Sequence, residues 1–84
     1  MARVRLSDIT LDKVGGIEEG LIVVATKSVE GIITKGNQYV LCKTFVSPRY
    51  IYYVKNDKGV ICSEMKFFVH LEDWRQFKLK DLGL

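Results

Sequence analysis

Few side chains in this 84-residue chain are of the types that commonly perform catalysis. His70 is the single histidine, and Glu72 and Asp73 follow it closely enough to orient an imidazole. Cys42 and Cys62 are the candidate nucleophiles, but no spacing in the sequence brings either thiol to the histidine. We therefore predict a protein that is not an enzyme and has no catalytic residues.

Metal and cofactor motifs are also missing from the sequence. Two cysteines and one histidine are too few for a four-ligand zinc site. Gly31–Gly36 contains glycine and lysine, but not in the order of a phosphate-binding loop. Asp57 with Glu64 lacks the alternating oxygen ligands of a calcium loop. We expect no metal and no cofactor.

The two cysteines lie in apolar, strand-like segments and do not form a C-x-x-C motif. This pattern favours two reduced, buried thiols. A disulfide between Cys42 and Cys62 is the alternative, provided that the two strands lie side by side with suitable geometry.

The pattern most typical of binding is the run from Lys43 to Lys58, which mixes tyrosines with cations and contains a single acid, Asp57. Tyrosine rings on a strand stack nucleic-acid bases while neighbouring cations hold the phosphates. The alternative is a structural role, in which the rings pack across the sheet and the lysines protect its edges. The candidate binding residues are Lys43, Arg49, Tyr50, Tyr52, Lys55 and Lys58.

Strand alternation divides these tyrosines between two faces of one strand. Tyr50 and Tyr52 share one face, and Ile51 and Tyr53 share the other. We expect Ile51 and Tyr53 to enter the core, which leaves Tyr50 and Tyr52 exposed for binding.

A second group of large aromatics and cations lies in the C-terminal tail. Because tryptophan and arginine are enriched at binding hot spots, Trp74 is a further candidate anchor for a partner. We favour a role in which Trp74 and Phe77 close one end of the core, since a small domain needs its aromatics there. The N-terminal Arg3 and Arg5 add charge that could become ordered only in a complex. The tail group is Trp74, Arg75, Phe77, Lys78 and Lys80.

The composition limits the class of protein. Hydrophobic residues make up 48% of the chain, which is enough for a packed core. No apolar run approaches the ~20 residues of a membrane helix, and the longest is Leu21–Ala25. Met1–Leu6 alternates charge with apolar residues and does not resemble a signal peptide, so we expect a cytoplasmic protein. The net charge of +3 permits contact with nucleic acid without requiring it.

The middle of the chain predicts a series of strands joined by tight turns. Leu21–Thr26 is β-branched and continuous, which indicates a strand buried on both faces. A loop follows over Ser28–Gly36, in which we expect Ile32 and Ile33 to fold back onto the core. Further strands are predicted at Tyr39–Phe45, Tyr50–Lys55 and Val60–Cys62. The turns that separate them are predicted at Gly36–Asn37, Ser47–Pro48 and Asn56–Gly59.

The two ends of the chain are more ambiguous. Val4 and Leu6 fit a strand, although Ser7–Asp8 could instead cap a short helical turn, and Gly15–Gly20 reads as a loop. Ser63 is a candidate N-cap for one helical turn before a strand-like run from Phe67 to Val69. In the tail, a helical stripe competes with strand alternation; we favour a turn at Glu72–Arg75 followed by a strand. The residues of the helical stripe are Leu71, Trp74, Phe77 and Leu82.

Together these elements predict one domain over residues 1–84, mainly β, with one short helical turn. Short strands with regularly spaced turns are typical of a small barrel. An SH3-like barrel is our first prediction, and an OB-like barrel the second.

One stretch resembles small phage-encoded SH3-like domains. It consists of a Lys-Gly turn leading into Tyr-Val, a tyrosine-rich strand, an Asn-Asp-Lys-Gly hairpin and a connection ending in phenylalanine. The residues are Lys35, Gly36, Tyr39, Val40, Asn56–Gly59 and Phe67 or Phe68. The resemblance implies a compact barrel and a phage accessory protein that binds and blocks a host enzyme, a defence component or a nucleic acid. The matching positions are structural, so no functional residue is transferred.

The functional prediction is therefore a binding protein of phage type. Its expected partner is a host protein or a protein–nucleic-acid complex, with Tyr50, Tyr52 or Trp74 as anchors. The alternative is binding of RNA or single-stranded DNA through the tyrosine, lysine and arginine side chains. Both a monomer and a homodimer remain open.

Overall fold

The computed structural model describes residues 5–81, with side-chain surroundings for residues 5–79. The predictions for Arg3, Val4 and Leu82 lie outside these residues, as do those for the side chain of Lys80. The elements are η1 (Leu6–Asp8), α1 (Leu11–Val14), β1 (Ile22–Ala25), β2 (Gln38–Val46), β3 (Arg49–Lys55), β4 (Ile61–Cys62), η2 (Met65–Phe67), β5 (Phe68–His70) and α2 (Leu71–Asp81).

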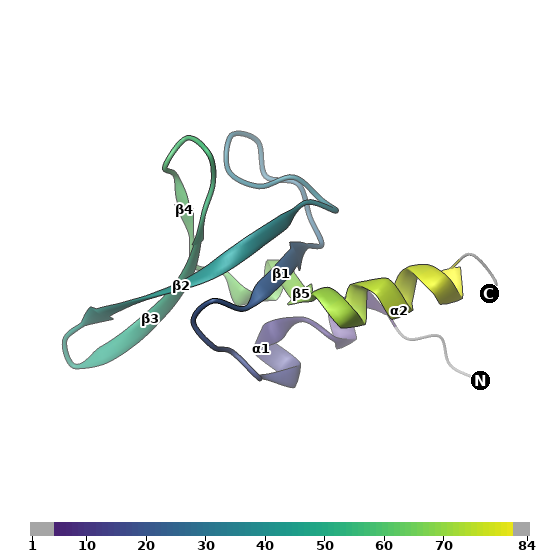
Figure 1. Ribbon diagram of the computed structural model, residues 1–84, viewed down its shortest axis with the longest axis horizontal. Helices are drawn as coiled ribbons and strands as arrows, with labels where there is room; N and C mark the ends of the chain where they lie inside the picture. The colour runs from purple at the N-terminus through teal and green to yellow at the C-terminus, as the bar shows by residue number, and fades with distance from the viewer. Residues whose placement is uncertain (1–4, 82–84) are drawn as a thin grey trace.

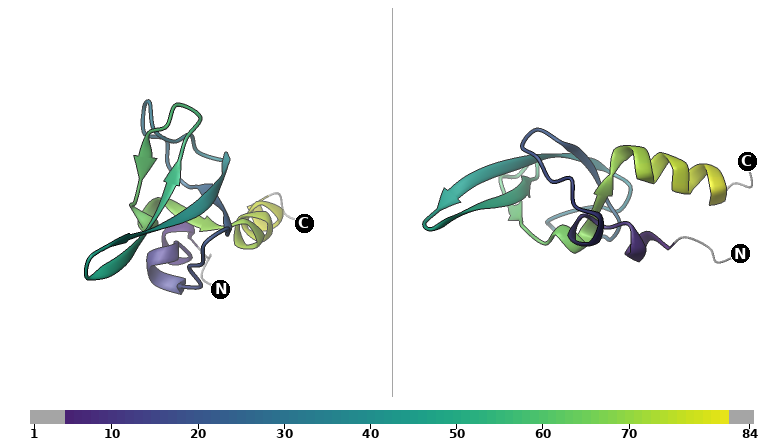
Figure 2. Two further views of the ribbon diagram at one scale, coloured as in Figure 1. Left: turned by 60° about the vertical axis from the view of Figure 1, so that its left-hand side comes forward. Right: turned by 90° about the horizontal axis from the view of Figure 1, so that it is seen from below.

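The strands form one antiparallel sheet in the order β4-β3-β2-β1-β5. The sheet curls into a half-barrel, and the prediction of a mainly β fold is confirmed (Figure 1). Residue Thr10, just before α1, adds an isolated bridge to Val69 at the β5 side. The tip of the β2–β3 hairpin and helix α2 lie at opposite ends of the molecule, as Figures 1 and 2 both show.

The core is centred on β1, as the β-branched run predicted. Val23 and Ala25 belong to the main core cluster, while Val24 is buried on the opposite side of the strand, beside its partner Val69. Burial on both faces is therefore confirmed. Ile33 is also buried, so the loop before β2 folds back onto the core as expected. The remaining members of the main cluster are Leu11, Leu41, Val54 and Phe68.

The β3–β4 turn is held by the side chain of Asn56. Its carboxamide oxygen accepts hydrogen bonds from the backbone N–H groups of Lys58 and Val60, each at 2.9 Å. Its amide nitrogen donates to the carbonyl oxygens of Gly31 (3.0 Å) and Ile32 (2.9 Å). Gly59 completes the turn with a φ of +83°, which glycine adopts without steric cost. One side chain thus joins the predicted hairpin to the loop before β2.

The C-terminal tail differs from the prediction. Residues Leu71–Asp81 form the helix α2 rather than a turn followed by a strand. Helical spacing brings the rings of Trp74 and Phe77 to a centroid distance of 6.3 Å, and places Lys78 Nζ 5.0 Å from the Trp74 ring. Glu72 and Asp73 in the first turn complement the helix dipole. The alternation of Phe77–Lys80 was too short to indicate a strand.

Two smaller predictions are also corrected. The short helix before β5 has Glu64 at its N-cap position rather than Ser63, and no side chain caps it. At the N-terminus the helical alternative is right, because η1 and α1 replace the strand over Leu6. Ser7 and Asp8, however, lie inside η1, and the N-cap positions of η1 and α1 are occupied by Arg5 and Thr10. The described chain therefore contains more helix than the single short turn expected.

Candidate interaction surface

The register of the β2–β3 hairpin determines which of its side chains share a face. Leu41 pairs with Val54, Lys43 with Tyr52 and Phe45 with Tyr50. Paired residues lie on the same side of a sheet. Because Leu41 and Val54 are buried in the core, we call this the inner face. The opposite, outer face consists of Cys42, Thr44, Val46, Arg49, Ile51 and Tyr53.

This register corrects the expected orientation of the tyrosines. Tyr52 packs against the core cluster, whereas Ile51 and Tyr53 lie on the outer face and are half-buried. Tyr50 shares the inner face with Tyr52 but lies beyond the core. The expectation that Ile51 and Tyr53 enter the core is wrong, because the parity of β3 is set by Val54 opposite Leu41.

A cluster of aromatic rings around one cation occupies the far part of the inner face. Lys43 Nζ lies 4.1 Å from the centroid of the Tyr50 ring and 5.9 Å from that of Tyr52. The rings of Phe45 and Tyr50 are 5.1 Å apart and tilted by 57°. A cation over an aromatic face contributes about 0.5–1 kcal/mol at an exposed site. Within this cluster Lys43 and Tyr52 are half-buried, whereas Phe45 and Tyr50 are exposed.

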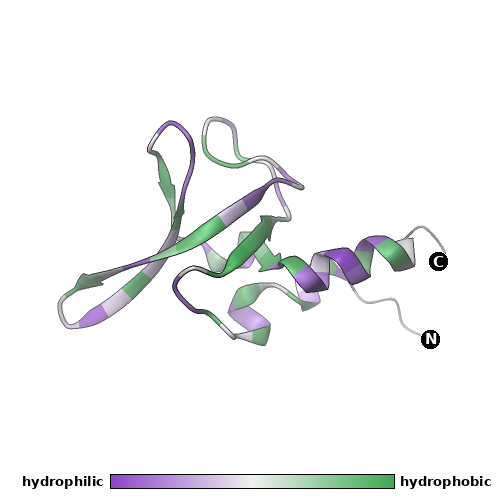
Figure 3. Cartoon of the chain, in the orientation of Figure 1, coloured by the Kyte–Doolittle hydropathy of each residue, from purple (hydrophilic) through white to green (hydrophobic). Residues whose placement is uncertain are grey.

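The distal hairpin, residues 43–52 of β2, β3 and the turn between them, exposes large apolar side chains on both faces. Phe45 is 57% exposed and Tyr50 58% on the inner face, and Val46 is 52% exposed on the outer face. Figure 3 shows hydrophobic residues along both strands of the projecting hairpin. Because Phe45 and Tyr50 are adjacent as well as exposed, this part of the hairpin is a candidate interaction site.

The same part of the hairpin lacks neighbouring strands. β1 pairs with β2 only through Val40, Tyr39 and Gln38. β4 pairs with β3 only at Val54 and Lys55. Among the described residues, the distal hairpin is therefore a two-stranded ribbon with two open edges, an arrangement that is only marginally stable without further packing.

The structure brings together only some of the predicted site residues. Lys43, Tyr50 and Tyr52 form one cluster on the inner face. Arg49 and Lys55 share the outer face by strand alternation, and Lys58 lies in the β3–β4 turn. Trp74 is half-buried in the first turns of α2, where its ring lies close to Gly36 in the loop before β2 rather than to the hairpin cluster.

Sequence reasoning missed Phe45 and Val46 as surface residues of this site. The predicted strand Tyr39–Phe45 ends at Phe45 and does not include Val46. The signal that could have identified Phe45 is its even spacing from Lys43, which places both on one face. The exposure of either residue depends on how far β1 and β4 extend, and no local pattern indicates that.

The cysteines are both free. Cys42 lies on β2 opposite Tyr53, whereas Cys62 lies on β4 opposite Val54, with β3 between them. Since Tyr53 and Val54 face opposite sides of β3, the two thiols do too. The disulfide alternative is therefore excluded by the sheet order, and both thiols are half-buried rather than buried.

His70 has a structural partner. Its Nε2 lies 2.8 Å from the carbonyl oxygen of Gly15, which ties the end of β5 to the loop after α1. In the part of the chain that the structure describes, neither Glu72 nor Asp73 is hydrogen-bonded to this imidazole. Residues 5–81 also contain no group of three or more histidine, cysteine, aspartate or glutamate side chains arranged to hold a metal ion.

Two shallow hollows lie elsewhere on the surface. A groove of about 850 Å³ runs between the loop before β2 and the β3–β4 turn, where Lys55 and Lys58 lie near Glu30 and Asp57. A second hollow of about 510 Å³, near η2, contains Phe67 flanked by the ammonium groups of Lys27 and Lys66 at 5.1 and 5.5 Å from the ring centroid.

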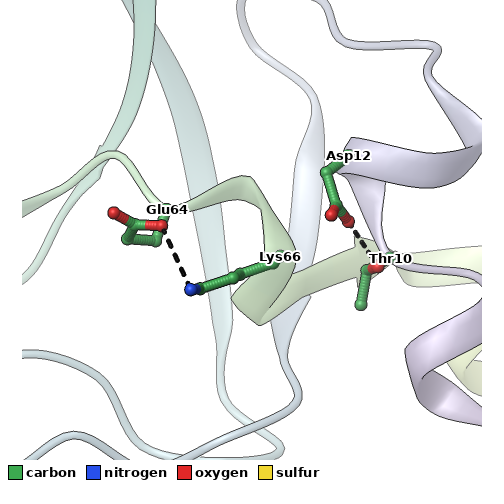
Figure 4. A network of polar contacts seen from close by, with 4 residues as sticks. All are labelled: Thr10, Asp12, Glu64 and Lys66. Atoms are coloured by element: carbon green, nitrogen blue, oxygen red, sulfur yellow. Dashed lines mark hydrogen bonds and ion pairs between the residues drawn. The ribbon is translucent and has the colours of Figure 1, made fainter.

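Charges of both signs line these hollows, so neither resembles a dedicated anion site. Near η2, Lys66 forms an ion pair with Glu64 at 3.9 Å, and the Thr10 hydroxyl donates to the Asp12 carboxylate (Figure 4).

No described helix is long and apolar enough to cross a membrane.

No family model, no curated protein and no solved structure matches the chain. The candidate interaction surface is therefore chosen on its geometry alone. Its centre is the distal β2–β3 hairpin, residues 43–52.

Proposed function

We propose that the protein is a non-enzymatic binding protein that recognises another protein through the distal β2–β3 hairpin. The observation that carries the proposal is the contact between Phe45 and Tyr50, two rings that pack on each other at the hairpin end yet remain mostly exposed. Tyrosine and phenylalanine are enriched at protein interfaces, where they contribute large contact areas.

The finer assignments are part of the same proposal. The half-barrel supports an SH3-like module, and the resemblance to phage-encoded domains supports an accessory protein acting on a host protein in the host cytoplasm. Trp74 would be a secondary contact, because α2 lies at the other end of the molecule.

Site-specific photocrosslinking in bacterial cells that express the protein tests this proposal. A photoreactive phenylalanine analogue is introduced at Phe45 and, as the matched control, at Val14, which is exposed to a similar degree but lies on α1. We expect one dominant protein adduct from position 45 and none from position 14. Identical adducts from both positions, or no protein adduct from position 45, would contradict the proposal.

A second candidate function is binding of RNA or single-stranded DNA. It is favoured by the position of Lys43 between Tyr50 and Tyr52 and by the absence of acidic residues from Gly31 to Asn56. The exposed aromatics could stack bases while the cations contact phosphates. Arg49, however, lies on the outer face and does not join the tyrosine cluster.

Fluorescence anisotropy with labelled oligonucleotides across a salt series tests this alternative. Binding would weaken with a slope of about −0.7 per phosphate contact in a log–log plot. Tyr50→Ala would then reduce affinity by about 1–3 kcal/mol, whereas the outer-face control Tyr53→Ala would not. No binding at low salt, or equal effects of the two variants, would exclude the tyrosine cluster as a nucleic-acid site.

A further inference from the structure

The edge of β3 next to β4 is open over most of its length. β4 contributes only Ile61 and Cys62, which pair with Lys55 and Val54. Within residues 5–81, no backbone hydrogen bond joins Arg49–Tyr53 to any element other than β2. An unpaired strand edge of this kind is a template for a further strand.

The hydrogen-bond pattern shows which backbone groups line this edge. The N–H of Asn56 donates to the carbonyl of Val60 at 2.9 Å, so these two residues form a hydrogen-bonded pair. Hydrogen-bonded and non-bonded pairs alternate along an antiparallel ladder. Residues with the parity of Asn56 therefore direct their backbone N–H and C=O groups toward the β4 side. On the open stretch these residues are Tyr50 and Tyr52.

The charge around this edge indicates the chemistry of an incoming strand. From Gly31 to Asn56 the chain has no acidic residue but four basic ones, of which Arg49 and Lys55 lie at the two ends of β3. Opposite charges directly across a strand pair stabilise it, and like charges destabilise it. A second copy of this hairpin would bring two basic strands together, whereas an acidic strand would neutralise them.

Apolar side chains next to the edge add a second requirement. Tyr50 on the inner face and Ile51 on the outer face both border the open stretch, and Tyr50 remains mostly exposed. Successive residues of an added strand would face alternately toward these two surfaces. Apolar residues in the incoming strand would therefore cover Tyr50 and Ile51, which β4 is too short to reach.

We propose that the protein binds its partner by strand addition, accepting an extended peptide segment that contains acidic and apolar residues along the Arg49–Tyr53 edge of β3. This inference rests on the proposed function, since it specifies how the hairpin would recognise a protein. Main-chain hydrogen bonds to Tyr50 and Tyr52 would supply affinity, and the flanking cations would select acidic sequences.

The experiment begins with selection of binders from a library of random peptides displayed on a surface. We expect the enriched peptides to combine acidic with β-branched or aromatic residues, and their affinity to fall at high salt. Hydrogen exchange of the protein with the best synthetic peptide should then slow at the amides of Tyr50 and Tyr52. The amides of Ile51 and Tyr53, which face β2, should change less.

Two substitutions at one position separate main-chain from side-chain recognition. Tyr50→Ala removes the ring but keeps the N–H, whereas Tyr50→Pro also removes the N–H, at a position where the donor faces outward and no ladder bond is lost. We expect the proline variant to bind the selected peptide about tenfold more weakly than the alanine variant. Unchanged amide spectra at Val23–Ala25 would show that the core persists.

The outcomes distinguish this inference from the function on which it rests. Equal losses in the two variants, with no exchange protection at Tyr50 and Tyr52, would overturn strand addition but retain the hairpin as a side-chain docking site. Selected peptides that bind both variants like the original protein would overturn the hairpin site itself. Failure to enrich any peptide, or enrichment of basic peptides, would overturn strand addition.

Discussion

Apolar residues of similar types are buried at one end of the β-sheet and exposed at the other. At the β1–β5 end, Val23, Val24 and Phe68 are completely buried, and neighbouring elements cover both faces of β1. At the distal end of the β2–β3 hairpin, Phe45 and Val46 are more than half exposed. Apolar composition alone therefore does not separate a buried strand from an exposed one. The difference in burial depends on whether the neighbouring strands extend far enough to cover the strand in question.

The sharpest way to test this difference is to remove one phenylalanine from each end. Phe68→Ala leaves a cavity in the core, and we expect it to lower the free energy of unfolding by about 3–5 kcal/mol. Phe45→Ala removes a ring of the same size from the surface, and we expect a loss of less than about 1 kcal/mol. Urea denaturation followed by circular dichroism measures both. Similar losses in the two variants would mean that the hairpin end is part of the core.

An intermediate effect is expected at Asn56, whose side chain holds the β3–β4 turn. Asn56→Ala removes two hydrogen bonds within the β3–β4 turn and two more that join this turn to the loop before β2. We expect a loss of about 1–3 kcal/mol in the free energy of unfolding, because backbone groups in both segments lose their partners.

The neighbouring Asp57 provides the control for this turn. Asp57→Ala is expected to change stability by no more than about 0.5 kcal/mol, since the residue is exposed and makes no described hydrogen bond. If the two substitutions destabilised the protein equally, the network around Asn56 would have no special role.

The smallest effect is expected within the hairpin cluster. Lys43 lies over the Tyr50 ring, so its side-chain ε-protons should resonate upfield of those of Lys55, which lies on the outer face. Tyr50→Ala should abolish this shift and lower the free energy of unfolding by at most about 1 kcal/mol. Side-chain NMR spectra of the protein and the variant provide the measurement. Equal shifts for the two lysines in the original protein would mean that the cluster does not form in solution.

Much of the sheet could be predicted from the sequence because its signals are local. The β-branched run at Leu21–Thr26 predicted β1, and Asn56–Gly59 predicted the turn before β4, as the structure confirms. Pro48 likewise separated β2 from β3. Each of these signals depends on a few adjacent residues whose own conformational preferences agree with the fold.

The surface could be predicted only in part, because it depends on relations between distant residues. The inner face of the hairpin is set by the pairing of Leu41 with Val54, and a strand read alone does not reveal which of its two faces meets the core. The open edges depend on the short reach of β1 and β4. The sequence does not predict helix α2, because the helical stripe through Trp74 and Phe77 and the strand-like alternation of Phe77–Lys80 compete over the same short tail.

The place where the hairpin leaves the core also bears on how this protein can change over generations. Hydrogen bonds between Leu41 and the Gly20–Leu21 segment, together with the pairing of Val54 with β4, fix the base of the hairpin. Beyond that base, we expect substitutions to alter the exposed surface with little loss of stability. If the hairpin is the proposed binding site, its recognition surface can change by mutation while the scaffold stays folded.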